Sequence, residues 1–192
     1  KRILSCGEIP FNFNLGKNKF LVFQDYFRKS RKISDSKKLA YAALNEISQI
    51  LENNNIAWTV FFGTLLGLVR DSDLMDHDDD IDFVIIGMKI EEFSETLLKF
   101  NQNFKIIKLE ENIISFVYKN SSFNIDFYFT NTFNKDNLIT FGGYDFEERI
   151  ISLLNKTENN KLIRFAFDYP ETLCHIRMPD NPLPFLEYLY GE

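Results

Sequence analysis

Aspartates crowd one short stretch of this sequence. Seven of the twelve residues from Asp71 to Asp82 are aspartates, and they lead directly into Phe83-Val84-Ile85-Ile86, which has the character of a buried strand. Two unit charges about 4 Å apart repel by roughly 1 kcal/mol in water and by roughly 4 kcal/mol at an effective dielectric near 20. Arg70 is the only arginine or lysine between residues 63 and 86. A divalent cation would compensate the repulsion most simply, and carboxylate oxygens suit Mg²⁺ or Mn²⁺.

Strand alternation indicates which carboxylates act together. Every second side chain of a strand points to the same face, so Asp80 and Asp82 project together. Asp78 joins them if the strand begins early, whereas Asp79 is expected to face away. In a later strand Asp126 is a lone carboxylate among apolar residues. A buried carboxylate is costly unless it is paired or bound to a metal, so we predict that Asp80, Asp82 and Asp126 converge on one metal site.

An acidic run of this kind also occurs in solvated loops, calcium loops and zinc sites. The apolar strand that follows means that the run is not wholly in solvent. An EF-hand needs Gly at its sixth position and Glu at its twelfth, and counting from Asp78 gives Phe83 and Lys89 there. Zinc is also disfavoured, because His77 and His175 have no Cys or His partner at ligand spacing.

The elements that must position these residues follow from periodicity and turn signals. Apolar residues at one helical face predict a helix that follows the caps Ser34 to Ser36 and ends at Asn53 to Asn55. Gly63-Thr64 is expected to separate a strand from a short buried helix, and a helix N-terminus there would favour a phosphate. Asn124 and Tyr128 share the face of Asp126 on their strand. The expected strands are 56–62, 80–86, 104–109, 113–118 and 123–129, and the expected later helices are 65–70, 89–100, 146–156 and a short one within 179–192.

The length suits one domain over residues 1–192, with residues 1–33 as an N-terminal extension, and the expected helices and strands predict an α/β (α+β) class. The net charge of −6 and the lack of a Lys/Arg stripe make nucleic acid a poor candidate partner. No apolar run approaches the roughly 18 residues of a membrane span, and the start lacks a signal-peptide pattern. We therefore expect a cytoplasmic protein, and a location at the inner face of the membrane stays open. Cys6 and Cys174 are expected to be free thiols, although one disulfide stays open. Because the chain starts with Lys, excision from a longer chain also stays open.

The stretch GTLLGLVRDSDLMDHDDDIDF resembles the signature of the LicD/fukutin family, GTLLG-x-x-R followed by a short spacer and DDDID. The matching residues are Gly63, Thr64, Gly67, Arg70, Asp78, Asp79, Asp80 and Asp82. The lead-in from Trp58 and the ending MPDNPLPFLEYLYGE are also similar, so the resemblance covers roughly residues 35–192. The family commonly has Pro-Trp before the three aspartates, where this chain has Asp76-His77. That departure leaves the shape of the substrate cleft, and with it the donor, open.

The resemblance implies a nucleotidyltransferase-like fold, a mixed sheet flanked by helices, and a set of site residues. Asp80 and Asp82 would hold Mg²⁺ or Mn²⁺, and Asp126 would complete the site or hold a second ion. Asp78 or Asp126 would accept the proton of the acceptor. Gly63 and Thr64 would hold the donor phosphates. Arg70 would either steady those phosphates or pair with an aspartate, and His77 would be either a base or a partner for acids. Tyr128 and Trp58 would either contact the donor or pack in the core.

The reaction that the family implies is transfer of a phospho-alcohol from a CDP-linked donor to a sugar hydroxyl of a cell-surface glycan, with release of CMP. CDP-choline and CDP-ribitol are family donors, and glycerol and ethanolamine analogues such as CDP-glycerol stay open. The acceptor would be a capsule, lipopolysaccharide or teichoic acid. Two alternatives remain: a nucleotidyltransferase that moves NMP to a small molecule, and a non-catalytic module that binds a metal or glycan.

Overall fold

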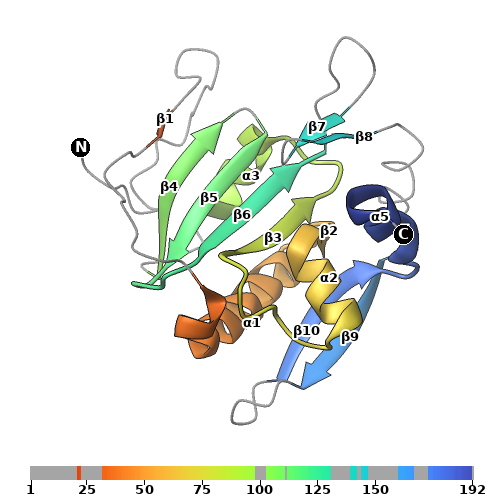
Figure 1. Cartoon of the computed structure of the whole chain (residues 1–192). Helices are drawn as coiled ribbons and strands as arrows, with labels where there is room; N and C mark the ends of the chain where they lie inside the picture. Colours follow the sequence, from red (N-terminus) through yellow and green to blue (C-terminus); the bar gives the residue numbers. More distant parts are fainter. Residues whose placement is uncertain are drawn as a thin grey trace.

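The computed structural model describes residues 21–22, 32–97, 103–110, 112–130, 139–141, 144–146, 160–166 and 173–191. Six strands form a mixed sheet in the order β1-β4-β5-β6-β3-β2 (Figure 1). Their bounds are Leu21–Val22 for β1, Trp58–Val60 for β2, Asp80–Ile85 for β3, Phe104–Glu110 for β4, Ile113–Tyr118 for β5 and Asn124–Phe129 for β6. β3 and β6 are parallel, and the other neighbouring pairs are antiparallel. The predicted α/β (α+β) class with a mixed sheet is confirmed.

The sequence placed most of these strands correctly. β4, β5 and β6 are consecutive antiparallel neighbours, as the short polar turns between them predicted. β1 lies within the expected N-terminal extension and pairs with β4 at the edge of the sheet. Cys6 lies outside the described residues, and Cys174 is a buried free thiol.

The junction between β2 and helix α2 differs from the prediction. α2 spans Phe62–Arg70, so Gly63 and Thr64 lie in its first turn and do not separate the strand from the helix. The chain turns one residue earlier, because Phe61 is extended with φ −146° and Phe62 has a positive φ of 45°. A positive φ is costly for a residue with a large side chain, which is why the sequence favoured the glycine as the break.

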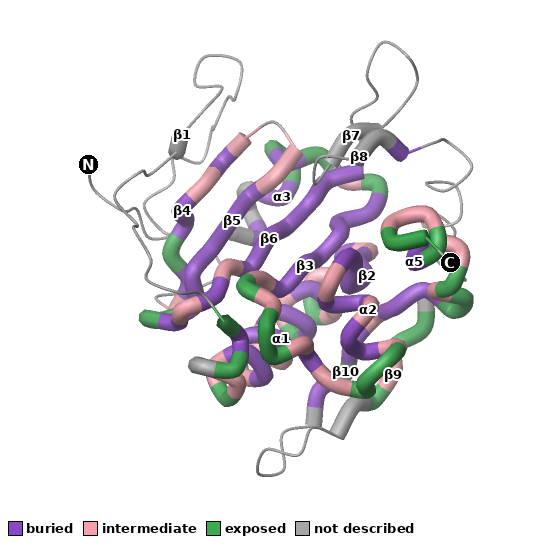
Figure 2. The backbone as a smooth tube through the Cα atoms, viewed as in Figure 1, coloured by how far each residue is buried: buried purple, intermediate pink, exposed green. Residues whose placement is uncertain are grey.

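Helices α1 and α3 cover the face of the sheet that is opposite to Asp82 and Asp126. α1 spans Lys37–Asn53 and α3 spans Ile90–Leu97, and Figure 1 shows α3 behind the sheet and α2 in front of it. Phe93 of α3 packs on Phe127 with ring centroids 5.6 Å apart, and Phe127 stacks on Phe83 at 5.1 Å. The central strands are therefore buried along nearly their whole length (Figure 2).

The start of α1 also differs in detail from the prediction. The expected caps Ser34 and Ser36 lie in a 3-10 turn, η2, over Ile33–Ser36, and Ser36 makes no side-chain capping hydrogen bond. The backbone of η2 is instead tied to the acidic loop, because Ile33 N–H donates to Asp78 O at 2.8 Å. This bond places the beginning of α1 beside the aspartates.

The C-terminal part adds two small antiparallel pairs and a helix. β7 (Ile139–Phe141) pairs with β8 (Tyr144–Phe146), β9 (Asn160–Ala166) pairs with β10 (Leu173–Pro179), and α5 spans Leu183–Tyr190. The sequence predicted the terminal helix but not these strands. The expected helix 146–156 is wrong at Phe146, which ends β8, and its other residues lie outside the described ones. Among the described helices, none has the length and apolar character required to cross a membrane.

Candidate active site

Three carboxylates from two parallel strands meet on one face of the sheet. The register of β3 and β6 pairs Asp82 with Asp126, so both side chains point to the same face. Asp80 lies two residues before Asp82 on that face, and a carboxylate oxygen from each of the three residues lies within 4.8 Å of the others. Asp82 is 3% exposed and Asp126 is 8% exposed. The structure thus brings the three predicted acids together, and their role as metal ligands stays a prediction.

The electrostatics of this carboxylate cluster, Asp80, Asp82 and Asp126, are unfavourable for three negative charges. Burial, followed by the charges of Asp80 and Asp126, raises the pKa of Asp82 well above its usual value. Burial and the charge of Asp126 raise the pKa of Asp80 to about 8. In the described part of the chain, no lysine or arginine forms an ion pair with Asp80 or Asp82. A close set of carboxylate oxygens of this kind suits a hard divalent cation.

The first turn of α2 fixes the backbone of Asp82. The pairing of β2 with β3 ends at Val60, which lies opposite Phe83. The backbone of Asp82, the preceding residue of β3, forms its hydrogen bonds with the turn at the start of α2. Asp82 O accepts a hydrogen bond from Phe61 N–H at 3.1 Å, and Asp82 N–H donates to Thr64 Oγ1 at 2.9 Å. Thr64 is buried, so its side chain secures β3 to α2. Contact of its backbone with a donor phosphate stays a prediction.

Two glycines on one face of α2 let the acidic loop lie directly against the helix. Gly63 and Gly67 are four residues apart and therefore face the same side. A Cβ at Gly63 would clash with the carboxylate of Asp78, and a Cβ at Gly67 would lie 2.7 Å from the backbone oxygen of Asp73. Backbone oxygens cannot move aside cheaply, so these glycines set how closely the loop approaches the site.

Three of the seven loop aspartates have cationic partners. Lys37 Nζ lies 2.7 Å from Asp73 and 2.6 Å from Asp76, and Arg70 Nη2 lies 2.6 Å from Asp71. Tyr41 Oη also donates to Asp73 at 2.6 Å. These contacts tie the loop to α1 and α2.

The four remaining aspartates, Asp78, Asp79, Asp80 and Asp82, are the DDDID acids of the signature. Burial raises the pKa of Asp78. Asp79 was expected to face away from Asp80, but a carboxylate oxygen of each of Asp78, Asp79 and Asp80 lies within 4.8 Å of the others. That expectation was wrong because β3 begins only at Asp80, so strand alternation does not apply to Asp79.

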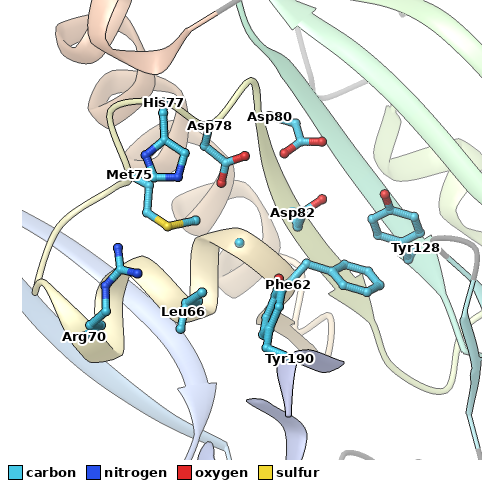
Figure 3. Close-up of a pocket in the computed structure, with 11 residues that line it drawn as sticks. Phe62, Leu66, Arg70, Met75, His77, Asp78, Asp80, Asp82, Tyr128 and Tyr190 are labelled. Atoms are coloured by element: carbon cyan, nitrogen blue, oxygen red, sulfur yellow. The ribbon is translucent and has the colours of Figure 1, made fainter. Parts of the chain in front are cut away.

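A cavity of about 440 Å³ opens beside the carboxylate cluster (Figure 3). Phe62, Leu66 and Met75 form apolar walls, and Tyr128 and Tyr190 contribute aromatic rings. The predicted residues in its lining are Gly63, Arg70, His77, Asp78, Asp80, Asp82 and Tyr128. This volume is within the range of small-molecule sites.

The aromatic predictions divide between the cavity and the core. Trp58 is fully buried and its Nε1–H donates to Glu52 at 2.7 Å, so packing in the core is its role. The Tyr128 hydroxyl hydrogen-bonds to Asp126, and burial and the charge of Asp82 raise its pKa. Sequence reasoning missed Phe62 and Tyr190. Phe62 directly precedes the glycine of the signature, and Tyr190 belongs to its terminal Tyr-Gly element, which are the signals that could have identified them.

Comparison with known proteins assigns the family. Residues 55–187 match the family described as LicD/FKTN/FKRP, nucleotidyltransferase domain. That match spans more than half of the chain, and the chain belongs to this family. The matched residues include β2, α2, β3 and β6, the elements that carry the cluster and the cavity.

A curated relative gives a narrower match. An uncharacterized protein of Rickettsia typhi (strain Wilmington) is 32% identical over 85 residues. The match covers 44% of this chain and 28% of the relative, so the chain spans less than a third of that protein. This relative therefore does not identify the donor or the acceptor.

Proposed function

We propose that this protein transfers a phospho-alcohol from a CDP-linked donor to a sugar hydroxyl of a cell-surface glycan and releases CMP. The observation that carries the proposal is the meeting of Asp80, Asp82 and Asp126 beside a cavity with aromatic walls, which Asp80 and Asp82 help to line. Membership in the LicD/FKTN/FKRP family supports the reaction class. Phosphocholine, glycerol phosphate and ribitol phosphate are the candidate cargoes.

Asp80, Asp82 and Asp126 would hold one Mg²⁺ or Mn²⁺ ion. Their oxygens are hard donors that lie close enough together for one ion, and they belong to adjacent strands whose register fixes their positions. When bound, a divalent cation neutralises phosphate charge and polarises the phosphoryl oxygens. By holding the cation, the three carboxylates would favour binding of the donor pyrophosphate beside the first turn of α2, where the N–H groups of Gly63 and Thr64 favour a phosphate.

The remaining cavity residues would orient the donor and the acceptor. Phe62, Tyr128 and Tyr190 offer aromatic surfaces for the cytosine of the donor, and aromatic stacking suits any flat base. Arg70 lines the cavity while its guanidinium is paired with Asp71. We propose that it contacts a donor phosphate from that position.

Asp78 is the residue that would accept the proton of the acceptor. It lines the cavity, whereas Asp126 does not, and burial raises its pKa, which makes its carboxylate a stronger base. The acceptor oxygen would form a bond to the far phosphorus of the donor as Asp78 takes its proton. The bond from that phosphorus to the bridging oxygen would break, and CMP would leave with the electron pair.

A panel of CDP-alcohols tests the proposal. The protein would be incubated with Mg²⁺ and CDP-choline, CDP-glycerol, CDP-ribitol or CDP-ethanolamine, and CMP would be quantified by chromatography. We expect one donor to give slow CMP release, with water replacing the glycan acceptor. Release of pyrophosphate from nucleoside triphosphates would instead support an NMP transferase. Absence of turnover with every donor would support a binding module and contradict the proposal.

A further inference from the structure

Asn124 lies beside the carboxylate cluster and has no role in the function proposed above. It is the first residue of β6, and the parallel register pairs it with Asp80, the first residue of β3. Its backbone N–H donates to Asp79 O at 2.9 Å, which fixes the two strand starts side by side. Because paired residues of parallel strands point to the same face, the Asn124 side chain lies on the face of Asp80 and Asp82.

The side-chain oxygen of Asn124 is buried without a hydrogen-bond partner among the described residues. Native proteins leave few buried polar atoms unsatisfied, and a site for an ion or a water is one common reason for those that remain. An amide oxygen is also one of the neutral ligands that hard divalent cations accept.

We propose that Asn124 Oδ1 is a further ligand of the divalent cation held by Asp80, Asp82 and Asp126. This inference rests on the proposed function, which supplies the cation. The amide would add an oxygen without adding another negative charge to a set that already repels itself. This explains why an asparagine, and not an aspartate, stands in register with Asp80. The competing role is that the Asn124 amide N–H₂ donates a hydrogen bond to the Asp80 carboxylate and only orients it.

Binding of Mn²⁺ alone, measured by titration calorimetry on the purified chain without donor, tests the assignment. Asn124→Leu removes both amide atoms at similar size, and we expect Mn²⁺ affinity to fall about 10- to 100-fold, the range seen when groups that support a metal site are removed. Asn124→Asp keeps an oxygen at the position, and its affinity is expected to equal or exceed that of the unaltered protein. Asn124→Ala repeats the test should the leucine variant fail to fold, which circular dichroism would reveal.

Three controls separate the outcomes. Asn112→Leu removes a buried amide oxygen near the other end of β6, where Asn112 O accepts from Phe129 N–H, and it should leave Mn²⁺ affinity unchanged. Asp82→Asn should abolish binding. Loss in Asp82→Asn but wild-type affinity in the Asn124 variants would overturn the Asn124 assignment and leave the proposed function standing.

Two other results also contradict the assignment. Weakened binding in both Asn124→Leu and Asn124→Asp would show that the amide donates to Asp80 and does not coordinate the ion. Absence of Mn²⁺ binding by the unaltered protein would overturn both the Asn124 assignment and the metal on which the proposed function depends.

Discussion

Two groups of carboxylates in this protein have opposite surroundings. Glu52, near the end of α1, accepts hydrogen bonds from Arg177 Nη2 at 2.8 Å and from Trp58 Nε1 at 2.7 Å. The hydrogen bond from Arg177 is the main cause of the lowered pKa of Glu52. Asp82 is buried among other acids, and its pKa is raised. The same chemical group is thus satisfied at one place and left under repulsion at another.

The difference separates a structural role from a functional one. The Glu52–Arg177 pair joins α1 to β10 and holds the C-terminal strands against the helix and β2. The carboxylate cluster connects β3 to β6, and neutral residues could make the same connection. The raised pKa values of Asp80 and Asp82 predict that this arrangement lowers the stability of the metal-free protein, as expected of a site kept for a ligand.

The largest expected effect is on catalysis in Asp82→Asn. Loss of a metal ligand removes several kcal/mol of transition-state stabilisation, and about 4 kcal/mol corresponds to roughly a 10³-fold slower transfer. CMP release from the active CDP-alcohol would measure the rate. The unfolding midpoint of the EDTA-treated variant should equal or exceed that of the unaltered protein, since a buried acid is removed.

Asp180→Asn is the matched control for this substitution. Asp180 forms an ion pair with Lys161 near the end of β10, and the variant should retain full activity. Unchanged turnover in Asp82→Asn would refute the metal role of Asp82. A variant that is inactive because it is unfolded would place Asp82 among the structural residues.

A smaller effect, on stability and not on the chemical step, is expected for Arg177→Met. The substitution removes a charged hydrogen-bond donor from Glu52, which should lower the free energy of unfolding by about 1–2 kcal/mol because the pair is partly exposed to solvent. Urea unfolding would measure the change, and Arg164→Met, on the exposed side of β9, is the control. A loss of Mn²⁺ affinity in Arg177→Met without a loss of stability would contradict the division between the two regions.

A difference in pH dependence is also expected between the two groups of carboxylates. The pKa of Asp80 is raised to about 8 in the folded protein, so the folded state retains a proton that the unfolded state has released. The stability of the metal-free protein should therefore fall as pH rises from about 4 to 8, by at most about 1.4 kcal/mol per pH unit for each such proton. Glu52, with its lowered pKa, acts oppositely, and its contribution is lost as pH falls below about 4.5.

Urea unfolding at pH 5 and pH 8, with EDTA or with Mg²⁺, measures both contributions. Saturating Mg²⁺ should remove most of the decline between the two pH values, because the bound ion favours ionised carboxylates. An EDTA-treated protein that is equally stable at both pH values would show that the acids are not under the repulsion described above.

The alternation of side chains along β3 and β6 predicted the three aspartates that these two strands contribute to the site. Alternation places Asp80 and Asp82 on one face and Asp126 on the matching face of its own strand, and only the order of the strands had to be supplied by the fold. The face of Asp79 was mispredicted because the start of β3 depends on its pairing with β6, which a single segment does not reveal.

Contacts between distant segments could not be predicted in the same way. Lys37 meets Asp73 and Asp76 only because α1 lies beside the acidic loop, and Arg177 reaches Glu52 across 125 positions of sequence. β9 and β10 were missed because their pairing with each other and the packing of β10 against α1 are tertiary effects. Sequence patterns thus identified the carboxylates of the cluster. The contacts that give the other loop aspartates a structural role could be seen only in the folded protein.

The most direct test of the central claim is the position of Mn²⁺ in a crystal of this protein. Data collected near the manganese absorption edge would locate the ion by its anomalous scattering. We predict a peak bounded by carboxylate oxygens of Asp80, Asp82 and Asp126. A crystal at saturating Mn²⁺ with no peak among these residues, or with an ion bound only at the Asp71 to Asp76 segment, would contradict the claim.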